Sequence, residues 1–314
     1  MNRKILAIFI LTSSIVLGAS AQSRILPILE ANPDIRTAAM GNTMLGSTNQ
    51  MYIYSNPAAL TFGPRRLSID ASTIAYPKSE DGRLMQYVAS AGYKFANRSA
   101  LLAGVRYQGG LTVQGNGQTN QRNTISPYDL TIDLGYSFAV VPELAVYATA
   151  TYTKSCAATS TNAYAFSVGA AYQKAFRLSA TLPTHLTIGA RLLDLGKPVK
   201  FNDMGLPYSL PTSVAVGGDW NVNIARQHAL TYALSCRHFT PKAAHETLVG
   251  TGLEYTYNKM VSLRMGYQFS DKAANAITFG AGGEFAGLKL NVAYNRTFAD
   301  YGLDTFLIGL GYTF

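Results

Sequence analysis

Long segments in which apolar and polar residues alternate limit the possible folds of this chain more than any other feature. The clearest segment is C-terminal, where one phase is apolar and the other mostly small or polar: Phe306, Ile308, Leu310, Tyr312 and Phe314 alternate with Leu307, Gly309, Gly311 and Thr313. The same period recurs in residues 130–138, 261–269, 277–285 and 288–295. Successive side chains of a strand point to opposite faces, so each segment predicts a β-strand with one apolar face. The period alone leaves a soluble β-sandwich and a membrane barrel both open.

Three further properties favour a transmembrane β-barrel. Many segments reach about ten residues, which is the length that a tilted strand needs to cross a bilayer. Aromatic residues gather near segment ends, as at residues 93–95 and 312–314, where a membrane barrel carries aromatic girdles. Charges within the strands fall on the polar phase and are expected to face the lumen; they are Arg106, Asp133, Arg191, Glu254, Arg264 and Glu284.

Alternating segments from Leu67 onward number about fourteen, and bacterial single-chain barrels have even strand numbers. The predicted fold class is therefore all-β: a transmembrane antiparallel β-barrel of about 14 strands over residues 67–314. With both chain ends on the periplasmic side, short turns are expected there at 95–99, 138–143, 258–259 and 286–287, with a longer one at 176–185. Longer loops are expected on the outer side at 108–127, 154–163, 196–211 and 238–246, an asymmetry typical of outer-membrane barrels.

Residues 1–21 have the order of a secretory signal peptide. A basic start at residues 3–4 precedes an apolar run over residues 5–17, and small residues before and at Ala21 predict cleavage there. Loss of the two basic residues would take the formal net charge from +9 to +7. A basic chain outside the cytoplasm could face lipopolysaccharide phosphates or an acidic partner, whereas a nucleic-acid partner is not expected in that compartment.

Residues 22–66 belong neither to the signal nor to the strands. Within them the stretch 36–62 is rich in Gly and Ala and contains an Asn56-Pro57-Ala58 sequence, in which Asn56 can close an Asx-type turn. Such a stretch also fits an ordinary surface turn of a soluble domain. It is the one segment available to fill the lumen of the expected barrel, so we predict an N-terminal plug or hatch over residues 22–66.

Little in the sequence suggests catalysis. The best case is a lipid hydrolase built from Ser235, His238 and His245, but Ser235 is on the polar phase and is expected to point into the lumen. Cys156, in an expected loop, and Cys236, on a strand, have no metal-binding spacing and are predicted to be unpaired. The prediction is a non-enzymatic protein without a metal or another cofactor.

Two motifs resemble those of PorV/PorQ-type outer-membrane proteins of Bacteroidetes, which are similar in fold to the FadL transporters. The first runs from Arg36, Ala38, Ala39, Met40 and Gly41 to Asn56, Pro57, Ala58, Ala59 and Leu60. The second comprises residues 188–196, Val199, Phe201, Leu206, Pro207, Leu210 and Pro211. Asp194 stands where the family usually has Asn, and Asn42 where a glycine is usual. The terminal Phe314 resembles the C-terminal assembly signal of outer-membrane barrels.

This resemblance implies a barrel in the outer membrane with a hatch in its lumen, associated with type IX secretion. The implied partners are periplasmic ring or translocon proteins and the C-terminal domains of secreted cargo, together with outer-membrane lipid or lipopolysaccharide. The alternative is a FadL-like transporter of hydrophobic small molecules, which requires an apolar pocket in the lumen. The implied site residues are the plug motif Arg36, Met40, Gly41, Asn56, Pro57 and Ala58, the loop motif Asp194, Leu195, Gly196, Leu206 and Pro207, and the assembly signal Tyr312 and Phe314.

Overall fold

The structure, a computed structural model, describes residues 24–115, 123–157, 159–179, 182–201, 207–242, 244–299 and 303–314. The predicted signal peptide lies outside the described residues, and so does Leu206 of the loop motif. No helix within the described part of the chain has the length and apolar character needed to cross a membrane.

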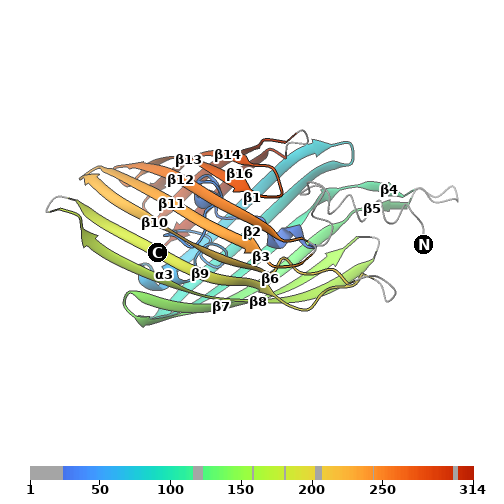
Figure 1. The fold of residues 1–314 in the computed structure, drawn as a ribbon, viewed down its shortest axis with the longest axis horizontal. Coiled ribbons are helices and arrows are strands. Elements are labelled where there is room, and N and C mark those ends of the chain that lie inside the picture. Colours follow the sequence, from blue (N-terminus) through green and yellow to red (C-terminus); the bar gives the residue numbers. More distant parts are fainter. Residues whose placement is uncertain are drawn as a thin grey trace.

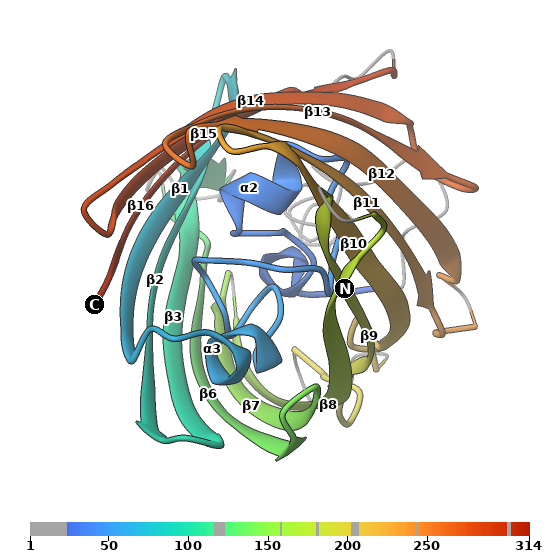
Figure 2. The same cartoon turned by 90° about the vertical axis from the view of Figure 1, so that its left-hand side faces the viewer.

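In the described part of the chain, fourteen strands form one closed antiparallel barrel (Figures 1 and 2). They are β1 (Leu67–Ser79), β2 (Gly82–Ala96), β3 (Ser99–Leu111), β6 (Tyr128–Val141), β7 (Leu144–Cys156), β8 (Ser160–Arg177), β9 (Pro183–Leu195), β10 (Ser213–Ala225), β11 (His228–Phe239), β12 (Glu246–Tyr257), β13 (Val261–Ser270), β14 (Ala276–Phe285), β15 (Leu288–Thr297) and β16 (Thr305–Thr313). Strand β16 closes the barrel on β1, with Ser68 opposite Thr313. The predicted all-β barrel of about fourteen strands is confirmed.

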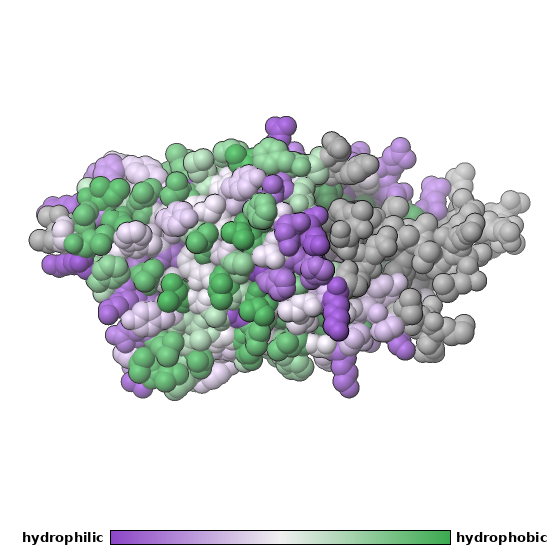
Figure 3. All heavy atoms as spheres, viewed as in Figure 1, coloured by the Kyte–Doolittle hydropathy of each residue, from purple (hydrophilic) through white to green (hydrophobic). Residues whose placement is uncertain are grey.

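The barrel wall is apolar outside and mixed inside, because the side chains alternate along each strand. On β16, Leu310 is 51% exposed whereas Leu307 is 1% exposed. Hydrophobic side chains spread over the outer wall in Figure 3. An apolar band of this extent around a closed sheet is the surface that a barrel presents to lipid hydrocarbon. The strands therefore have the surface of membrane-spanning segments.

The two ends of the barrel differ in their connections. At the turn end, short turns at 97–98, 142–143, 258–260 and 286–287 join successive strands, as the sequence predicts. At the loop end, the connections after β9 and β11 match the expected loops. A separate hairpin of β4 (Val113–Gly115) and β5 (Asn123–Ile125) projects from the loop end within the expected loop 108–127 (Figure 1).

The expected loop at 154–163 is wrong. Strands β7 and β8 stay paired as far as Cys156 and Ser160, so Cys156 ends a strand. Tyr152 and Tyr164 lie opposite each other with ring centroids 5.4 Å apart. Cross-strand aromatic pairs of this kind stabilise an antiparallel ladder, which explains why the polar residues here extend the strands.

The first described residue, Arg24, does not lie at the end of the barrel where both chain ends are expected. Arg24 forms a bridge with Ser209 and an ion pair with Glu246 at the loop end, whereas Phe314 lies at the turn end. The reason is the path of residues 24–66, called here the N-terminal segment. It runs from the loop end through the barrel interior to the start of β1 at the turn end.

The N-terminal segment contains three short helices: η1 (Pro27–Leu29), α2 (Ile35–Ala38) and α3 (Ala58–Phe62). The view along the barrel in Figure 2 places α2 and α3 inside the ring of strands. Ile35 packs in a buried cluster with Ala293 and Leu307 of the wall. Leu45 and Ala58 pack with other inward residues, including Tyr147. The segment thus supplies much of the apolar interior that the inward faces of the strands lack. Its closing of the lumen to solutes stays a prediction.

Glycines on the inner wall let the segment approach the strands closely. Those under residues 39–41, called here the glycine seat, are Gly250, Gly252, Gly266 and Gly280. A methyl group added at Gly266 would overlap the backbone of Met40 and Gly41, and one added at Gly280 would lie 2.5 Å from Ala39 Cβ. Gly41 itself has a φ of +72°, a left-handed conformation that favours glycine. Residues 39–41 therefore lie against positions of the wall that carry no side chain.

Replacing Gly266 by Val is expected to lower the free energy of unfolding by about 1–3 kcal/mol, the usual cost of overpacking. The added side chain meets backbone atoms of the N-terminal segment, which cannot rotate away. Urea unfolding measures the change. Gly283→Val is the matched control, because the nearest atom to an added Cβ there is 3.8 Å away. Equal stability of the two variants would contradict the glycine seat.

Candidate functional site

One buried group of charges joins the N-terminal segment to the wall toward the turn end. Arg36 donates to Glu254 through Nη2 to Oε1 at 2.7 Å and through Nε to Oε2 at 3.0 Å. Arg264 donates to the same carboxylate at 2.5 Å, and its Nη1 donates to Asn291 Oδ1 at 2.7 Å. Asn291 donates to Gln50 Oε1 at 2.9 Å. These five residues, called here the Glu254 cluster, begin and end on the N-terminal segment.

Strand register and burial hold the charges of this cluster together. Glu254 and Arg264 lie directly opposite each other on β12 and β13, and both are less than one tenth exposed. Asp219 of β10 lies 3.9 Å from Arg36 and accepts a hydrogen bond from Ser47. Burial disfavours the charged form of Arg36, but the carboxylates of Glu254 and Asp219 more than offset it and raise the pKa of Arg36. Loss of one partner would leave a buried charge unpaired.

Backbone groups of the segment also bind the wall. The Gly41 N–H donates to Thr278 Oγ1 at 2.8 Å, and the Thr278 hydroxyl donates to the Ala39 carbonyl at 2.9 Å. Near the turn end, Lys94 Nζ donates to the carbonyls of Thr61 and Gly63 at 2.7 and 2.8 Å. Polar contacts therefore fix the segment along its length.

The Asn56-Pro57-Ala58 sequence forms the turn that starts α3. The Ala58 N–H donates to Asn56 Oδ1 at 3.2 Å, which is the Asx-type turn expected from the sequence. Asn56 Nδ2 donates to the carbonyls of Leu45 and Gly46 at 3.2 and 2.9 Å. Asn56 is fully buried, so its side chain provides the hydrogen-bond partners that these buried backbone groups of the segment need.

Three inward arginines lie on the loop-end side of the glycine seat. Arg106 pairs with Asp133 at 2.8 Å, and Arg237 pairs with Asp194 at 3.4 Å. Arg191 donates instead to Thr149 Oγ1 at 3.0 Å and more weakly to backbone carbonyls of residues 53–54. These side chains fix the polar inner wall around a cavity.

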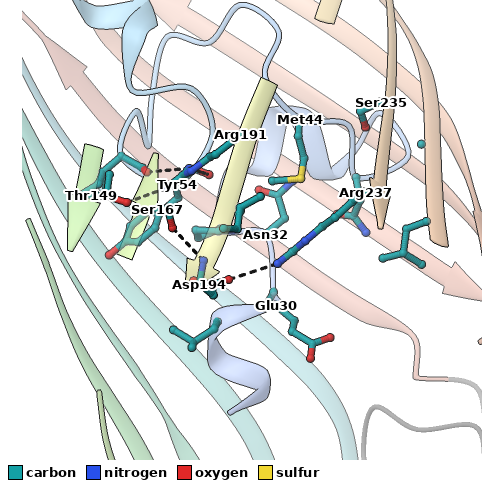
Figure 4. Close-up of a pocket in the computed structure, with 18 of the residues that line it drawn as sticks. Glu30, Asn32, Met44, Tyr54, Thr149, Ser167, Arg191, Asp194, Ser235 and Arg237 are labelled. Carbon is teal, nitrogen blue, oxygen red and sulfur yellow. Dashed lines mark hydrogen bonds and ion pairs between the residues drawn. The ribbon is translucent and has the colours of Figure 1, made fainter. Parts of the chain in front are cut away.

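This inner cavity has a volume of about 150 Å³ and lies between the N-terminal segment and the inner faces of β3, β6 to β9 and β11 to β13 (Figure 4). Arg191, Asp194, Arg237 and Tyr54 lie around it in Figure 4, with Glu30 at one side. Its lining combines charged groups with Met44, Ile53 and other apolar side chains. The inner cavity can therefore hold a small molecule that has both apolar and polar parts.

A larger outer cavity of about 520 Å³ lies at the loop end and adjoins the inner cavity. The two share the lining residues Glu30, Ala31, Asn32, Asn42, Leu248 and Gln268. The outer cavity is mostly apolar, with Ile74, Tyr76, Phe239, Leu303, Leu307 and several alanines in its lining. An apolar space at the loop end thus leads to a more polar space deeper in the barrel.

Arg24 and Glu30 stand beside the outer cavity. Arg24 pairs with Glu246 at 2.5 Å and with Glu30 at 3.2 Å, and its guanidinium stacks 3.9 Å from the ring centroid of Phe239. Burial raises the pKa of the Glu30 carboxyl above its ordinary value, and the opposing effect of Arg24 only reduces the rise. These contacts hold the start of the N-terminal segment against the loop end.

A third cavity of about 400 Å³ opens at the turn end. Its lining is polar and includes Asn49, Asn221, Asn223, Lys289 and the Glu254 cluster residues Arg36, Glu254, Arg264 and Asn291. It shares no lining residue with the inner cavity. The N-terminal segment, held by the glycine seat and the Glu254 cluster, lies between the two.

The residues predicted from the sequence fall into separate places. Arg36, Met40 and Gly41 meet the glycine seat and the Glu254 cluster, whereas Asn56, Pro57 and Ala58 form the α3 turn. The predicted lumen charges all lie on the inward face; five are buried, and Glu284 is half-buried and accepts from Asn49 at 3.0 Å. In the loop motif, Asp194 pairs with Arg237, and Gly196 packs on Tyr164 and Leu210. The side chains of Leu195 and Pro207 are exposed. The assembly-signal residues Tyr312 and Phe314 face outward.

Sequence reasoning missed several residues of the site. Asp219 and Arg237 lie on the inward phase of β10 and β11, and that phase could have identified them. Arg24 and Glu30 gave no such signal, because they belong to an irregular segment. The position of Arg24, for example, depends on its contact with Glu246, which is more than 200 residues away in the sequence.

The residues considered for catalysis do not come together. Ser235 is buried on the inward face of β11, whereas His238 is exposed and its Nδ1 lies 3.0 Å from Thr247 Oγ1. Cys156 and Cys236 are both free. Among the described residues, no group of three His, Cys, Asp or Glu side chains could hold a metal ion.

Comparison with solved structures finds barrels of the same kind. The toluene transporter TbuX of Ralstonia pickettii has a TM-score of 0.58 at 13% identity, over 92% of this chain and 100% of that chain. The fold is that of the FadL-type barrels. The toluene transporter TodX of Pseudomonas putida gives 0.56 at 14% identity over 88% and 96%, and a FadL homologue of Pseudomonas aeruginosa gives 0.52 at 12% over 90% and 97%.

No family model and no curated protein matches the sequence. At identities this low, the likeness concerns the FadL-type fold alone. The finer resemblance to PorV/PorQ-type proteins stays a prediction from the two sequence motifs.

Replacing Glu254 by Gln is expected to loosen the N-terminal segment. The change leaves Arg36 and Arg264 buried without their shared carboxylate, and breaking a buried pair in this way costs about 3–5 kcal/mol. Single-channel recording in a planar bilayer should show larger or more frequent openings than in the unmodified protein. Glu143→Gln, at an exposed position of the turn end, is the control. Identical conductance in all three proteins would rule out a role of the Glu254 cluster in closing the lumen.

Proposed function

We propose that this protein is an outer-membrane channel that takes up hydrophobic small molecules from the loop end. The observation that carries the proposal is the pair of adjoining cavities. The outer one is large and mostly apolar, and it leads to the inner one beneath the loop end. A hydrophobic solute gains free energy by leaving water for such a space, at about 25 cal/mol per Å² of apolar surface buried.

The inward phase of the strands is mostly small or polar, and such residues by themselves would not form an apolar pocket in the lumen. The apolar lining of the outer cavity instead collects single residues from many elements. Ile74, Phe239, Leu248 and Leu307 come from four different strands, and Leu303 comes from the connection before β16. A lining assembled in this way leaves no apolar run in the sequence.

The FadL-type fold supports the proposal without deciding the substrate. Solved structures with this fold include two named as toluene transporters and one named as a monoaromatic hydrocarbon channel, CymD, which has a TM-score of 0.54 at 13% identity. In this chain the cavity walls carry both aromatic and aliphatic side chains. The proposed class is accordingly a small, largely apolar molecule.

Association with type IX secretion stays a prediction of the sequence resemblance. Purification in a gentle detergent, followed by identification of co-purifying chains, tests it directly. Recovery of periplasmic ring or translocon proteins would support a role in secretion, and recovery of the barrel alone would count against it.

Replacing Leu248 by Glu is expected to reduce uptake of a hydrophobic tracer by about tenfold or more. Leu248 lines both cavities, and a carboxylate there would put an unpaired charge on the path of an apolar solute. Uptake is measured with labelled toluene and with a labelled fatty acid in a deletion strain that carries each variant. Leu248→Met keeps the volume and the apolar character, so it should retain uptake. Unchanged uptake in the deletion strain itself would refute the proposed function.

A further inference from the structure

The turn end of the barrel carries a ring of exposed basic side chains. They are Arg65, Arg66, Arg98, Lys174, Arg177, Arg226 and Lys259, called here the basic rim. None of the seven forms an ion pair within the described part of the chain. Among the described residues, Glu143 is the one exposed acidic side chain at this end, and Glu284 is half-buried there. Seven exposed cations against one exposed acid form a strongly positive surface.

The loop end is charged in a different way. Its cations Lys78, Arg83, Lys154, Lys197, Lys200, Lys242, Lys272 and Arg296 are interspersed with the acids Glu80, Asp81, Asp271 and Asp304. The four acids offset about half of these eight cations, so the excess of positive charge is greater at the turn end, where seven exposed cations accompany one exposed acid. Surface charges of this kind act over about one Debye length, roughly 10 Å at moderate salt.

We propose that the basic rim binds the headgroups of anionic phospholipids in the membrane leaflet at the turn end. The cations come from the residues just before β1, from the end of β8 and from the β2–β3, β10–β11 and β12–β13 connections, so they surround most of the barrel. A bilayer meets a barrel on all sides, whereas a protein partner meets one side. The distribution around the barrel favours lipid.

The rim also lies at the height where headgroups are expected. Next to the basic rim, the outer wall carries exposed aromatic side chains, namely Tyr93, Phe95, Phe176, Tyr255 and Tyr257. Aromatic girdles of membrane barrels lie at the boundary between hydrocarbon and headgroups. Arg177 directly follows Phe176 at the end of β8, and Lys259 is two residues after Tyr257. These two cations therefore lie just beyond the girdle, whereas Lys174 lies two residues before Phe176, at the level of the girdle, from which its long side chain can extend toward lipid phosphates.

Guanidinium and ammonium groups are suited to this ligand. Arg donates two parallel hydrogen bonds to a phosphate, and Lys supplies a compact charge. A basic group near an anionic membrane surface contributes about 1 kcal/mol, which corresponds to roughly a fivefold change in binding. Binding by the rim would fix the depth and orientation of the barrel in the membrane, and it does not depend on the proposed transport.

The test compares lipids retained by the full chain in a nonionic detergent, using native mass spectrometry. Phosphatidylglycerol and phosphatidylcholine with the same acyl chains are added in equal amounts. The variant Arg66→Gln/Arg98→Gln/Lys174→Gln/Arg177→Gln removes four rim cations, and Lys78→Gln/Lys197→Gln/Lys200→Gln/Lys242→Gln removes four loop-end cations as a matched control. Heat-modifiable migration in gels checks that each variant is folded.

The unmodified protein and the loop-end control are expected to retain phosphatidylglycerol preferentially. The rim variant should lose that preference by about tenfold or more, and high salt should have a similar effect on the unmodified protein. An unchanged preference in the rim variant, or an equal loss in the loop-end control, would overturn the proposal. If lipid preference is unchanged but binding of polyglutamate is lost in the rim variant, the rim serves an acidic protein instead.

Discussion

The close approach of the N-terminal segment to the inner wall is the constraint on which the rest of this structure depends. A barrel of fourteen strands encloses a space that its small inward side chains do not fill, and the segment fills it with its backbone almost against the strands. Gly252 and Gly266 make this close approach of the two backbones possible, and the Glu254 cluster fixes the segment there with buried charges. Neither would suffice alone, because glycines provide space without attraction, and buried charges need geometry that holds them together.

This arrangement also shapes the cavities. Where the segment lies against β12 to β14, it separates the polar cavity at the turn end from the two at the loop end. The outer and inner cavities adjoin beside Glu30 and Asn42 of the segment. The same stretch of chain thus both fills part of the barrel interior and lines its cavities, so movement of the segment would alter the two together.

The two ends of the barrel differ in chemistry. The loop end has irregular connections, a hairpin, an apolar cavity and mixed charge. The turn end has short connections and the basic rim. The apolar outer wall between them is continuous, because alternation along each strand sends one phase outward. The difference between the two ends therefore comes from the connections between strands more than from the strands themselves.

The sequence by itself determined the barrel, because a period of two over long segments, as in 305–314, leaves few other structures for a chain with outward aromatic residues. It also determined the inward charges such as Glu254 and Arg264, since phase alone fixes the face of a strand. Only the tertiary structure decided that these two meet Arg36, that Phe239 and Leu248 share a cavity, and that residue 24 lies at the loop end. Those contacts join residues far apart along an irregular segment, where no period exists and closure of the barrel decides which side chains meet.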